Sequence, residues 1–283
     1  METGILVTGG TGTVGRHVVR RLAAARVADL RVLSRRARPP GEETPARWFV
    51  GELVSGEGLE PALAGVGTII HCAGDARRPS RDIPAVDGLV AAARRSVATI
   101  GAPAPHLVVV SIVGIERMPF AYYRIKVAVE RLVEASGLPW TILRSTQFHD
   151  LIYRLVGGLA RLPVVPVPAG VRFQPIDADE VAARLVTLAR GTPTGRAADL
   201  GGPQVLGFDD LVRGYLHSRG LRRPILRVPV PGAFARSLRA GANLTPDHAD
   251  GQRTWAAFLA EQAGTGPETG TGAGTGSETE ISG

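Results

Sequence analysis

The sequence predicts an α/β fold, in which a doubly wound parallel sheet is covered by helices on both faces and carries a small C-terminal cap. Short runs rich in β-branched residues alternate with amphipathic helical patterns up to about residue 145, as in successive βαβ units with right-handed crossovers. Runs such as LVVVSIV are apolar on both faces, which is typical of strands buried between two layers of helices. With 283 residues, of which 44% are hydrophobic, the chain can bury one large core or two modest ones.

The first half of the chain supplies the predicted sheet and its helices. Strands are predicted at residues 4–10, 30–35, 66–74, 106–114 and 139–145. Helices are predicted between them, at residues 16–26, 59–65, 85–97 and 122–137. The last of these helices is expected to end at Gly137, because glycine readily adopts the left-handed conformation that closes a helix and Pro139 follows.

The pattern becomes less regular from about Phe148 onwards. Prolines interrupt the segment LPVVPVP, and a helical pattern opened by Asp177–Glu180 follows. Helices are predicted in this half at residues 175–191, 208–220 and 250–261.

One domain with a tail is the expected organisation. We expect residues 1–262 to form a single domain, to which residues 148–175 and 203–262 contribute a small substrate cap. Residues 263–283 are rich in Gly, Thr and Glu. Such a segment cannot bury enough apolar surface to fold, so we predict a disordered tail.

Composition excludes several classes of function. The net charge is +7 and 32 of the 33 basic residues are arginine, but the arginines are scattered without interleaved aromatic residues, which argues against binding of nucleic acid. Six arginines and no acidic residue lie between Arg219 and Arg239, and we interpret this cluster as a solvated face rather than a site for an acidic ligand or partner. The sequence does not set an oligomeric state.

The compartment expected from the sequence is the cytoplasm. A single cysteine, Cys72, permits no internal disulfide bond and is compatible with a reducing compartment. No signal peptide is visible, and the longest apolar stretch is too interrupted to cross a membrane. The histidines are too scattered to predict a metal site.

A glycine-rich loop lies between the first predicted strand and the first predicted helix. TGGTGTVG, residues 8–15, fits the pattern G-x-G-x-x-G at Gly10, Gly12 and Gly15. The pattern alone is weak, but this strand–loop–helix context is the one in which backbone amides at a helix N-terminus hold the diphosphate of a dinucleotide. The sequence therefore predicts a Rossmann-type dinucleotide site.

The end of the second predicted strand indicates which dinucleotide is bound. An NAD site usually places an acidic residue about 20 residues past the loop, where it accepts the 2′-hydroxyl of the adenosine ribose. Here that place is held by Ser34, Arg35 and Arg36. A hydroxyl and two guanidinium groups suit a 2′-phosphate, so we predict NADP(H), with NAD(H) as the less favoured cofactor.

The only lysine of the chain, Lys126, follows Tyr122 by four residues. In a helix the two side chains share one face, and Ser111 precedes them at the end of a predicted strand, where ligands of parallel sheets bind. A phenol can donate a proton as hydride reaches a carbonyl, and an ammonium nearby is expected to lower the pKa of that phenol. We predict Tyr122 as the proton donor, Lys126 as its partner and Ser111 as the group that orients the substrate; Tyr123 remains a rival for Tyr122.

These segments together resemble a known superfamily. TGGTGTVG, IIHCAG, SIVG, YYRIKVAVE and GLPWTILRSTQFHD are similar to sequences of the atypical and extended short-chain dehydrogenases/reductases, and closest to their NmrA-like NAD(P)H-binding branch. The resemblance covers about residues 4–260. It implies a Rossmann fold, NADP(H) at the glycine loop, and Ser111, Tyr122 and Lys126 in the places of the family's Ser, Tyr and Lys.

The resemblance extends the predicted site. It places Cys72, Ala73 and Gly74 beside the nicotinamide ribose and Leu53 near the adenine, where the preceding Glu52 departs from the usual Asp. The predicted cofactor-binding residues are Gly9, Thr11, Gly12, Thr13, Val14, Gly15, Ser34, Arg35, Arg36, Leu53, Cys72, Ala73, Gly74, Lys126 and Thr146. The predicted substrate contacts at the strand rim are Gln147, Phe148 and His149.

The function expected from these residues is that of an NADP(H)-dependent oxidoreductase acting on a carbonyl or conjugated carbon of a small organic substrate. Many members of the NmrA-like branch lack the catalytic tyrosine and act as cofactor sensors, so a non-catalytic regulator is one alternative. A sugar-nucleotide epimerase or dehydratase, which shares the fold, is the other.

Overall fold

The computed structural model of the chain describes residues 3–38, 41, 44–74, 78–101 and 103–264. Its centre is a seven-stranded sheet with the order β3-β2-β1-β4-β5-β6-β9, in which every neighbouring pair is parallel. The strands are β1 (Gly4–Thr8), β2 (Leu30–Ser34), β3 (Arg47–Val50), β4 (Val66–His71), β5 (His106–Ile112), β6 (Trp140–Ser145) and β9 (Gly195–Arg196). Strand order reverses between β1 and β4, and ligands of such sheets bind in the crevice at that reversal.

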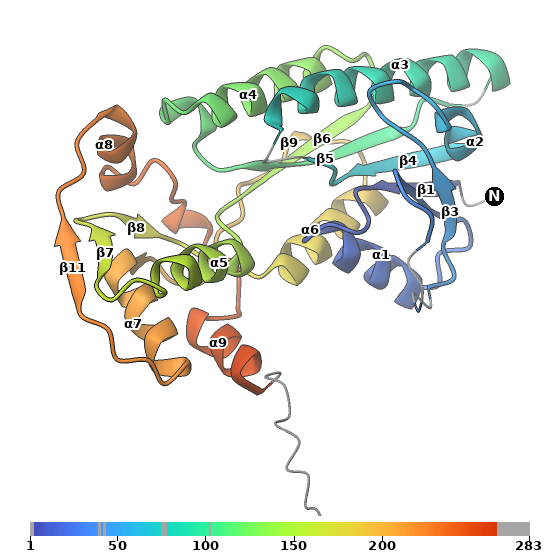
Figure 1. Cartoon of the computed structure of the whole chain (residues 1–283). Coiled ribbons are helices and arrows are strands. Elements are labelled where there is room, and N and C mark those ends of the chain that lie inside the picture. Colours follow the sequence, from blue (N-terminus) through green and yellow to red (C-terminus); the bar gives the residue numbers. More distant parts are fainter. Residues whose placement is uncertain (1–2, 39–40, 42–43, 75–77, 102, 265–283) are drawn as a thin grey trace, which may run out of the picture.

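Two layers of helices cover this sheet (Figure 1). On one face lie α1 (Gly15–Ala24) and α6 (Ala178–Arg190), and on the other lie α2 (Leu59–Leu63), α3 (Asp82–Ile100) and α4 (Ala121–Glu134). Each layer buries its own apolar cluster against the sheet. The strands are therefore apolar on both faces because both faces are covered.

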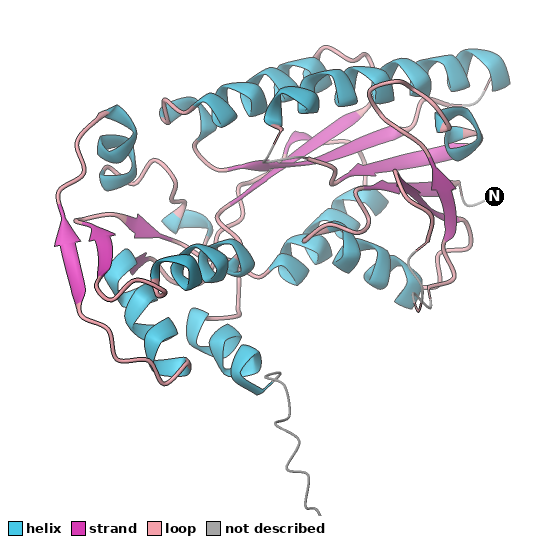
Figure 2. Cartoon of the chain, viewed as in Figure 1, coloured by secondary structure: helices cyan, strands magenta, loops and turns pink. Residues whose placement is uncertain are grey.

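The second half of the chain adds a smaller packed unit beside the carboxyl ends of the strands (Figure 2). It contains α5 (His149–Leu159), α7 (Phe208–Ser218), α8 (Ala233–Arg239) and α9 (Trp255–Gly264), and the short strands β7 (Val165–Pro168), β8 (Arg172–Phe173), β10 (Leu206–Gly207) and β11 (Ile225–Val228). Strand β7 pairs with β11 and β8 pairs with β10. Residues of α5, α7 and α9 form a third apolar cluster. Three short 3₁₀ turns complete the described chain, at Pro79–Arg81, Ile115–Arg117 and Pro246–His248.

The predicted fold class is confirmed, and the differences are local. Strand β3 was not predicted, because it is short and its end residues Arg47 and Val50 are exposed. Helix α5 was also missed: it buries Ile152 and Val156 one turn apart, but Gly157 and Gly158 lie in its last turn and weaken the helical pattern. The helix predicted at 250–261 begins only at Trp255 and runs to Gly264; the remainder of the predicted tail lies outside the described residues.

None of the helices in the described part of the chain combines the length and the apolar character needed to cross a bilayer.

Candidate functional site

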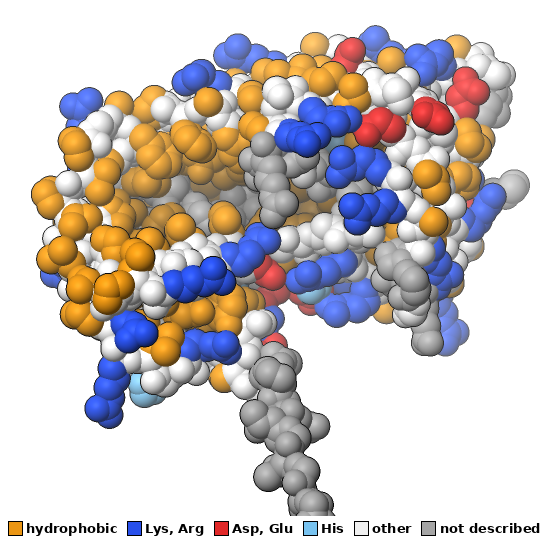
Figure 3. Space-filling view, in the orientation of Figure 1, with side chains coloured by type: hydrophobic (Ala, Val, Ile, Leu, Met, Phe, Trp, Pro, Cys, Tyr) orange, Lys and Arg blue, Asp and Glu red, His pale blue; other side chains and the backbone are white. Residues whose placement is uncertain are grey.

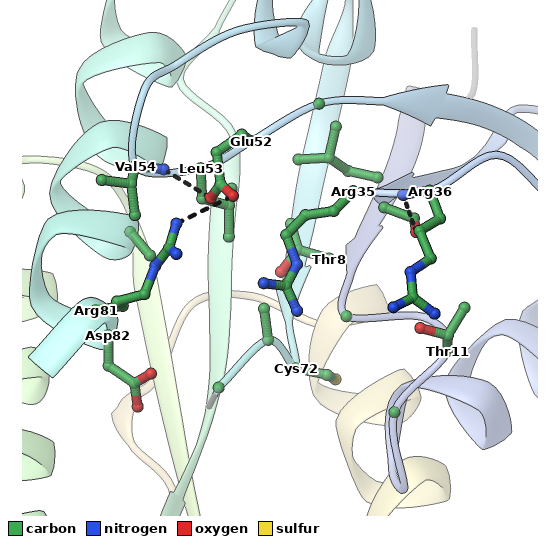
Figure 4. A pocket seen from close by; sticks show the side chains of 18 residues that line it. Thr8, Thr11, Arg35, Arg36, Glu52, Leu53, Val54, Cys72, Arg81 and Asp82 are labelled. Atoms are coloured by element: carbon green, nitrogen blue, oxygen red, sulfur yellow. Dashed lines mark hydrogen bonds and ion pairs between the residues drawn. The ribbon is translucent and has the colours of Figure 1, made fainter. Parts of the chain in front are cut away.

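A cavity of about 390 Å³ opens at the carboxyl ends of β1, β2 and β4, where the strand order reverses (Figure 4). Its lining residues come from the glycine loop, the ends of β2, β3 and β4, and the start of α3. They are Thr8, Gly9, Thr11, Gly12, Leu33, Ser34, Arg35, Arg36, Gly51, Glu52, Leu53, Val54, Cys72, Ala73, Gly74, Arg81, Asp82 and Ala85. Most of the residues predicted from the sequence to bind the cofactor therefore face one cavity. Thr13, Val14, Gly15, Lys126 and Thr146 are not part of the lining.

Close backbone packing explains two glycines of the loop. Gly9 has φ +71°, and a Cβ there would lie 2.6 Å from the amide nitrogen of Ala73, so the loop after β1 rests on the end of β4. A Cβ on Gly15 would lie 2.1 Å from the carbonyl oxygen of Gly9. Helix α1 therefore begins directly on the turn, as a dinucleotide fold requires of its third glycine.

The N-terminus of α1 is suited to an anion. No side chain caps the helix at Val14, and its first turn contains no acidic residue. The amides of Thr13, Val14 and Gly15 donate to no acceptor within the described residues. Free N–H groups at the positive end of a helix dipole bind phosphate, so Thr13, Val14 and Gly15 could contact a diphosphate through their backbone without lining the cavity.

Two arginines lie at the end of β2. The backbone amide of Arg36 donates to Ser34 Oγ at 3.1 Å, and the guanidinium groups of Arg35 and Arg36 make no ion pair with any described residue. In Figure 4 both guanidinium groups extend from the strand end toward the cavity, that of Arg36 beside Thr11. The arrangement fits a phosphate ester better than a free ribose hydroxyl, because no acidic side chain accompanies these cations on the lining at this strand end.

Glu52, which stands where an aspartate was expected, is held by interactions within the protein. One of its carboxylate oxygens accepts from the amide of Val54 at 3.2 Å, and the other pairs with Arg81 at 3.2 Å. Glu52 thus ties the loop after β3 to the start of α3, and the neighbouring Leu53 lines the cavity.

The end of β4 contributes a neutral wall. Burial raises the pKa of the Cys72 thiol to about 12, so it stays protonated and is no nucleophile. His71 is hydrogen-bonded to Thr8 Oγ1 at 2.8 Å, and burial together with the charge of Lys126 lowers its pKa to about 3. His71 is therefore neutral and links the ends of β1 and β4.

Two polar groups beside the cavity lack hydrogen-bond partners in the described part of the chain. Ser111 lies in β5 near its carboxyl end and is buried, and its Oγ has no hydrogen-bond partner among the described residues. Lys126 lies on α4 with 8% of its surface exposed. Within the described ranges its Nζ makes no hydrogen bond, and its ion-pair partner is Asp82, with Oδ2 at 3.9 Å. A buried ammonium without hydrogen bonds is costly, so both groups are suited to a ligand.

Tyr122 differs from the expectation in one respect. Its pKa is raised to about 12, first by burial and then by the charges of Asp82 and of the neighbouring Tyr123. The predicted lowering by Lys126 is not found in the protein alone, because burial and the Asp82 carboxylate both disfavour the phenolate.

Tyr123, the rival of Tyr122, has different surroundings. Its ring lies 5.7 Å from Phe120 and 6.5 Å from Phe234, measured between ring centroids. It belongs to an aromatic cluster between α4 and α8, whereas Tyr122 is coupled to Asp82, the partner of Lys126. Asp82 thus influences the pKa of Tyr122 and contacts Lys126, which favours Tyr122 over Tyr123 as the residue that acts together with the lysine.

The residues after β6 hold the second half of the chain in place. Thr146 Oγ1 donates to the carbonyl oxygen of Gln174 at 2.5 Å, and Gln147 Nε2 donates to the carbonyl oxygen of Asn243 at 3.0 Å. Both side chains are buried, and Phe148 packs against the apolar cluster of α1 and α6. These contacts fit an anchoring role more readily than the predicted contacts with cofactor or substrate.

His149 does not fit the predicted contact with substrate. Its exposed fraction is 0%, and its ring stacks on Phe258 at 5.0 Å and packs against Trp255 at 5.8 Å. Its Nδ1 lies 3.9 Å from the carboxylate of Asp177, a residue that also caps α6 through the amide of Asp179. The histidine points into the third apolar cluster instead of into the cavity because the chain enters α5 at this residue.

Asp82 is the site residue that sequence reasoning missed. It is 6% exposed and lines the cavity, and its carboxylate forms an ion pair with Lys126 at 3.9 Å. The sequence prediction began the helix at residue 85, which left Asp82 in a loop. An acidic residue in the first turn of a helix that follows a strand-end motif was the available signal.

Comparison with known sequences gives consistent matches. Residues 9–156 match a family model described as NAD(P)H-binding. The chain is 32% identical to a (4-alkanoyl-5-oxo-2,5-dihydrofuran-3-yl)methyl phosphate reductase of Streptomyces griseus, over 71% of this chain and 69% of that protein. It is 31% identical to a ceramide reductase of Caulobacter vibrioides, over 84% of this chain and 76% of that protein.

Solved structures share the fold. The triphenylmethane reductase of Citrobacter sp., complexed with NADP(H), superposes with a TM-score of 0.73 at 20% identity and covers 92% of this chain and 99% of its own. The NADPH-dependent quinone oxidoreductase of Escherichia coli, complexed with NADPH, gives 0.73 at 15% identity, over 91% and 99%. At these identities the likeness establishes the fold.

Proposed function

Because this chain belongs to the NAD(P)H-binding family and matches two reductases over most of its length, it is an NAD(P)H-dependent oxidoreductase, and we propose that it reduces a carbonyl or conjugated carbon of a small organic substrate with NADPH. The observation that carries this proposal is the buried Lys126 ammonium, which has no hydrogen-bond acceptor in the described part of the chain. It lies next to Asp82, a residue that lines the cavity. A panel of carbonyl and conjugated compounds, assayed by NADPH oxidation, tests it: turnover supports the reductase, and tight NADPH binding without turnover of any member supports a sensor instead.

The residues present fit NADP(H). The amides of Thr13–Gly15 would hold the diphosphate, and Arg35 and Arg36 would hold the 2′-phosphate. Lys126 would donate to a ribose hydroxyl on the nicotinamide side, where the end of β4 and Asp82 line the cavity. The bound coenzyme supplies the hydride.

Side chains of the protein would orient the substrate and donate the proton that the reduction requires. Ser111 Oγ, buried and without a protein partner among described residues, would donate a hydrogen bond to the substrate oxygen. Tyr122 would donate the proton that the oxygen or carbon takes up as hydride arrives. Its raised pKa keeps the phenol protonated through neutral and moderately alkaline pH, which suits the reductive direction.

The substrate side is apolar. Phe120 is 48% exposed, and its ring lies 5.2 Å from Phe234 of α8 and 5.7 Å from Tyr123 of α4. Figure 3 shows hydrophobic side chains gathered around a hollow between the region of α8 and the start of α4. We propose that residues 148–175 and 203–262 form a cap over this hollow and that the substrate has an apolar, planar part.

Phe234→Ala is expected to raise KM for 1,4-naphthoquinone about tenfold, because loss of an apolar ring removes about 1.5 kcal/mol of binding free energy. KM for butane-2,3-dione, which is small and lacks a ring, should change little. Steady-state NADPH oxidation measures both. Val50→Ala, an exposed apolar residue of β3 at the far edge of the sheet, is the matched control. An equal rise of KM for both compounds would contradict the aromatic contact.

The double variant Arg35→Ala/Arg36→Ala is expected to weaken NADPH binding about 100-fold, because it removes charge-assisted hydrogen bonds to the 2′-phosphate. NADH has no such phosphate, so its Kd should stay nearly constant and provides the internal control. Fluorescence titration of each nucleotide measures the change. Equal weakening of both nucleotides would show that the two arginines do not read the phosphate.

A further inference from the structure

Asp82 joins the cofactor cavity to the proposed catalytic helix. It is the first residue of α3, its carboxylate is 6% exposed, and it lines the cavity. In Figure 4 its side chain turns away from Arg81, which reaches up to Glu52. Its Oδ2 lies 3.9 Å from Lys126 Nζ on α4, the helix that packs against α3.

On the basis of the reductase function proposed above, we propose that Asp82 is a positioning residue, whose carboxylate holds the Lys126 ammonium at the wall of the cofactor cavity. The side chain of Lys126 is long and flexible, so it loses rotamer entropy when it is held in one orientation. A fixed countercharge on a neighbouring helix restricts that freedom before the coenzyme binds, which is a general requirement of preorganised sites.

The other charged or titratable groups that face Lys126 do not replace Asp82. Glu130 lies one turn away on the same helix, but Arg144 Nε donates to its carboxylate at 2.9 Å and binds it further through Nη2. His71 of β4 is neutral, and Tyr122 of α4 keeps its proton. Among the described residues, Asp82 is the carboxylate within 4 Å of the ammonium.

The same carboxylate acts on both members of the Tyr–Lys pair. Burial lowers the pKa of Lys126, while Asp82 and then Glu130 raise it. Asp82 also raises the pKa of Tyr122. A negative charge at this position therefore favours a protonated lysine together with a neutral phenol, which are the states that a proton donor and a ribose-binding ammonium require.

The single lysine makes this role directly measurable. Lysine labelled with ¹³C at Cε gives one side-chain signal, because Lys126 is the only lysine of the chain. Asp82→Asn removes the negative charge that raises the pKa of Lys126, whereas the burial that lowers this pKa remains. The midpoint of the Lys126 titration should therefore move to lower pH by about one unit. The basic limb of kcat/KM for NADPH-dependent reduction should move in the same direction. Asp87→Asn, an exposed position on the same helix, should leave the midpoint unchanged.

Further variants separate this role from a merely structural one. Asp82→Glu retains the charge and should keep the Lys126 midpoint near that of the wild type, and it serves as the test if Asp82→Asn does not fold. In the Lys126→Gln background, Asp82→Asn should lower activity little further, since Asp82 acts through the lysine. The NMR titration needs no turnover, so it remains decisive if the protein reduces none of the compounds tested. Overlapping titrations of wild type and Asp82→Asn, or a midpoint in Asp82→Glu that falls by about one pH unit although the charge is retained, would overturn the role of Asp82.

Discussion

Tyr122→Phe is expected to lower kcat for NADPH-dependent reduction by about 10²–10⁴-fold, the usual contribution of a positioned general acid. The phenolic hydroxyl is the only group removed, and the ring that packs beside Tyr123 remains. The Kd for NADPH should therefore be nearly unchanged. Steady-state kinetics and a fluorescence titration on the same preparation measure the two quantities separately.

Tyr123→Phe is the matched control for that experiment. Tyr123 lies one residue along the same helix and is similarly buried, but it packs among Phe120 and Phe234. Its variant should retain most of the wild-type kcat. A large loss of kcat in Tyr123→Phe with little loss in Tyr122→Phe would reverse the assignment between the two tyrosines.

Gly12→Val is expected to weaken NADPH binding more than 100-fold while leaving the protein folded. Within the protein a Cβ at Gly12 would meet only the carbonyl oxygen of Gly9, at 3.2 Å, so the fold should tolerate the change. Gly12 lines the cavity beside the N-terminus of α1, where a side chain would keep the diphosphate from its amide donors. Each charge-assisted hydrogen bond lost there costs about 1.5–3 kcal/mol.

Thermal unfolding and nucleotide titration of Gly12→Val separate the two effects. Gly191→Val is a suitable control, because Gly191 is exposed after α6 and a Cβ there would make only ordinary contacts at 3.6 Å. Gly15 is unsuitable for this purpose, since its Cβ would lie 2.1 Å from the Gly9 carbonyl and disturb the turn itself. Wild-type affinity for NADPH in Gly12→Val would show that the diphosphate does not lie on this loop.

The sequence predicted five of the seven strands of the central sheet, because these strands and the helices between them repeat short, strongly periodic patterns. It also predicted the glycine loop, because Gly15 packs against the backbone of Gly9 six residues earlier and such a short-range contact leaves a recognisable spacing of glycines. Ser34, Arg35 and Arg36 could be located in the sequence for a similar reason, because Ser34 ends a recognisable strand and the two arginines follow it directly.

Residues whose contacts lie in the second half of the chain were harder to predict from the sequence. Gln147 and His149 come just after a strand, a position that is typical of ligand-binding residues. Their contacts, however, lie about 100 residues further along the sequence: Gln147 contacts Asn243, and His149 contacts Trp255 and Phe258. Nothing local distinguishes such an anchoring residue from a substrate contact. Asp82 was missed for a related reason, because its significance comes from Lys126 on another helix.

A crystal structure of the protein with NADP⁺ tests the central claim most directly. We predict the diphosphate on the amides of Thr13–Gly15 and the 2′-phosphate between Arg35 and Arg36. Lys126 Nζ should lie at hydrogen-bond distance, about 3 Å, from a hydroxyl of the nicotinamide ribose. A nucleotide bound elsewhere, or a Lys126 side chain directed away from a correctly seated nucleotide, would contradict the account.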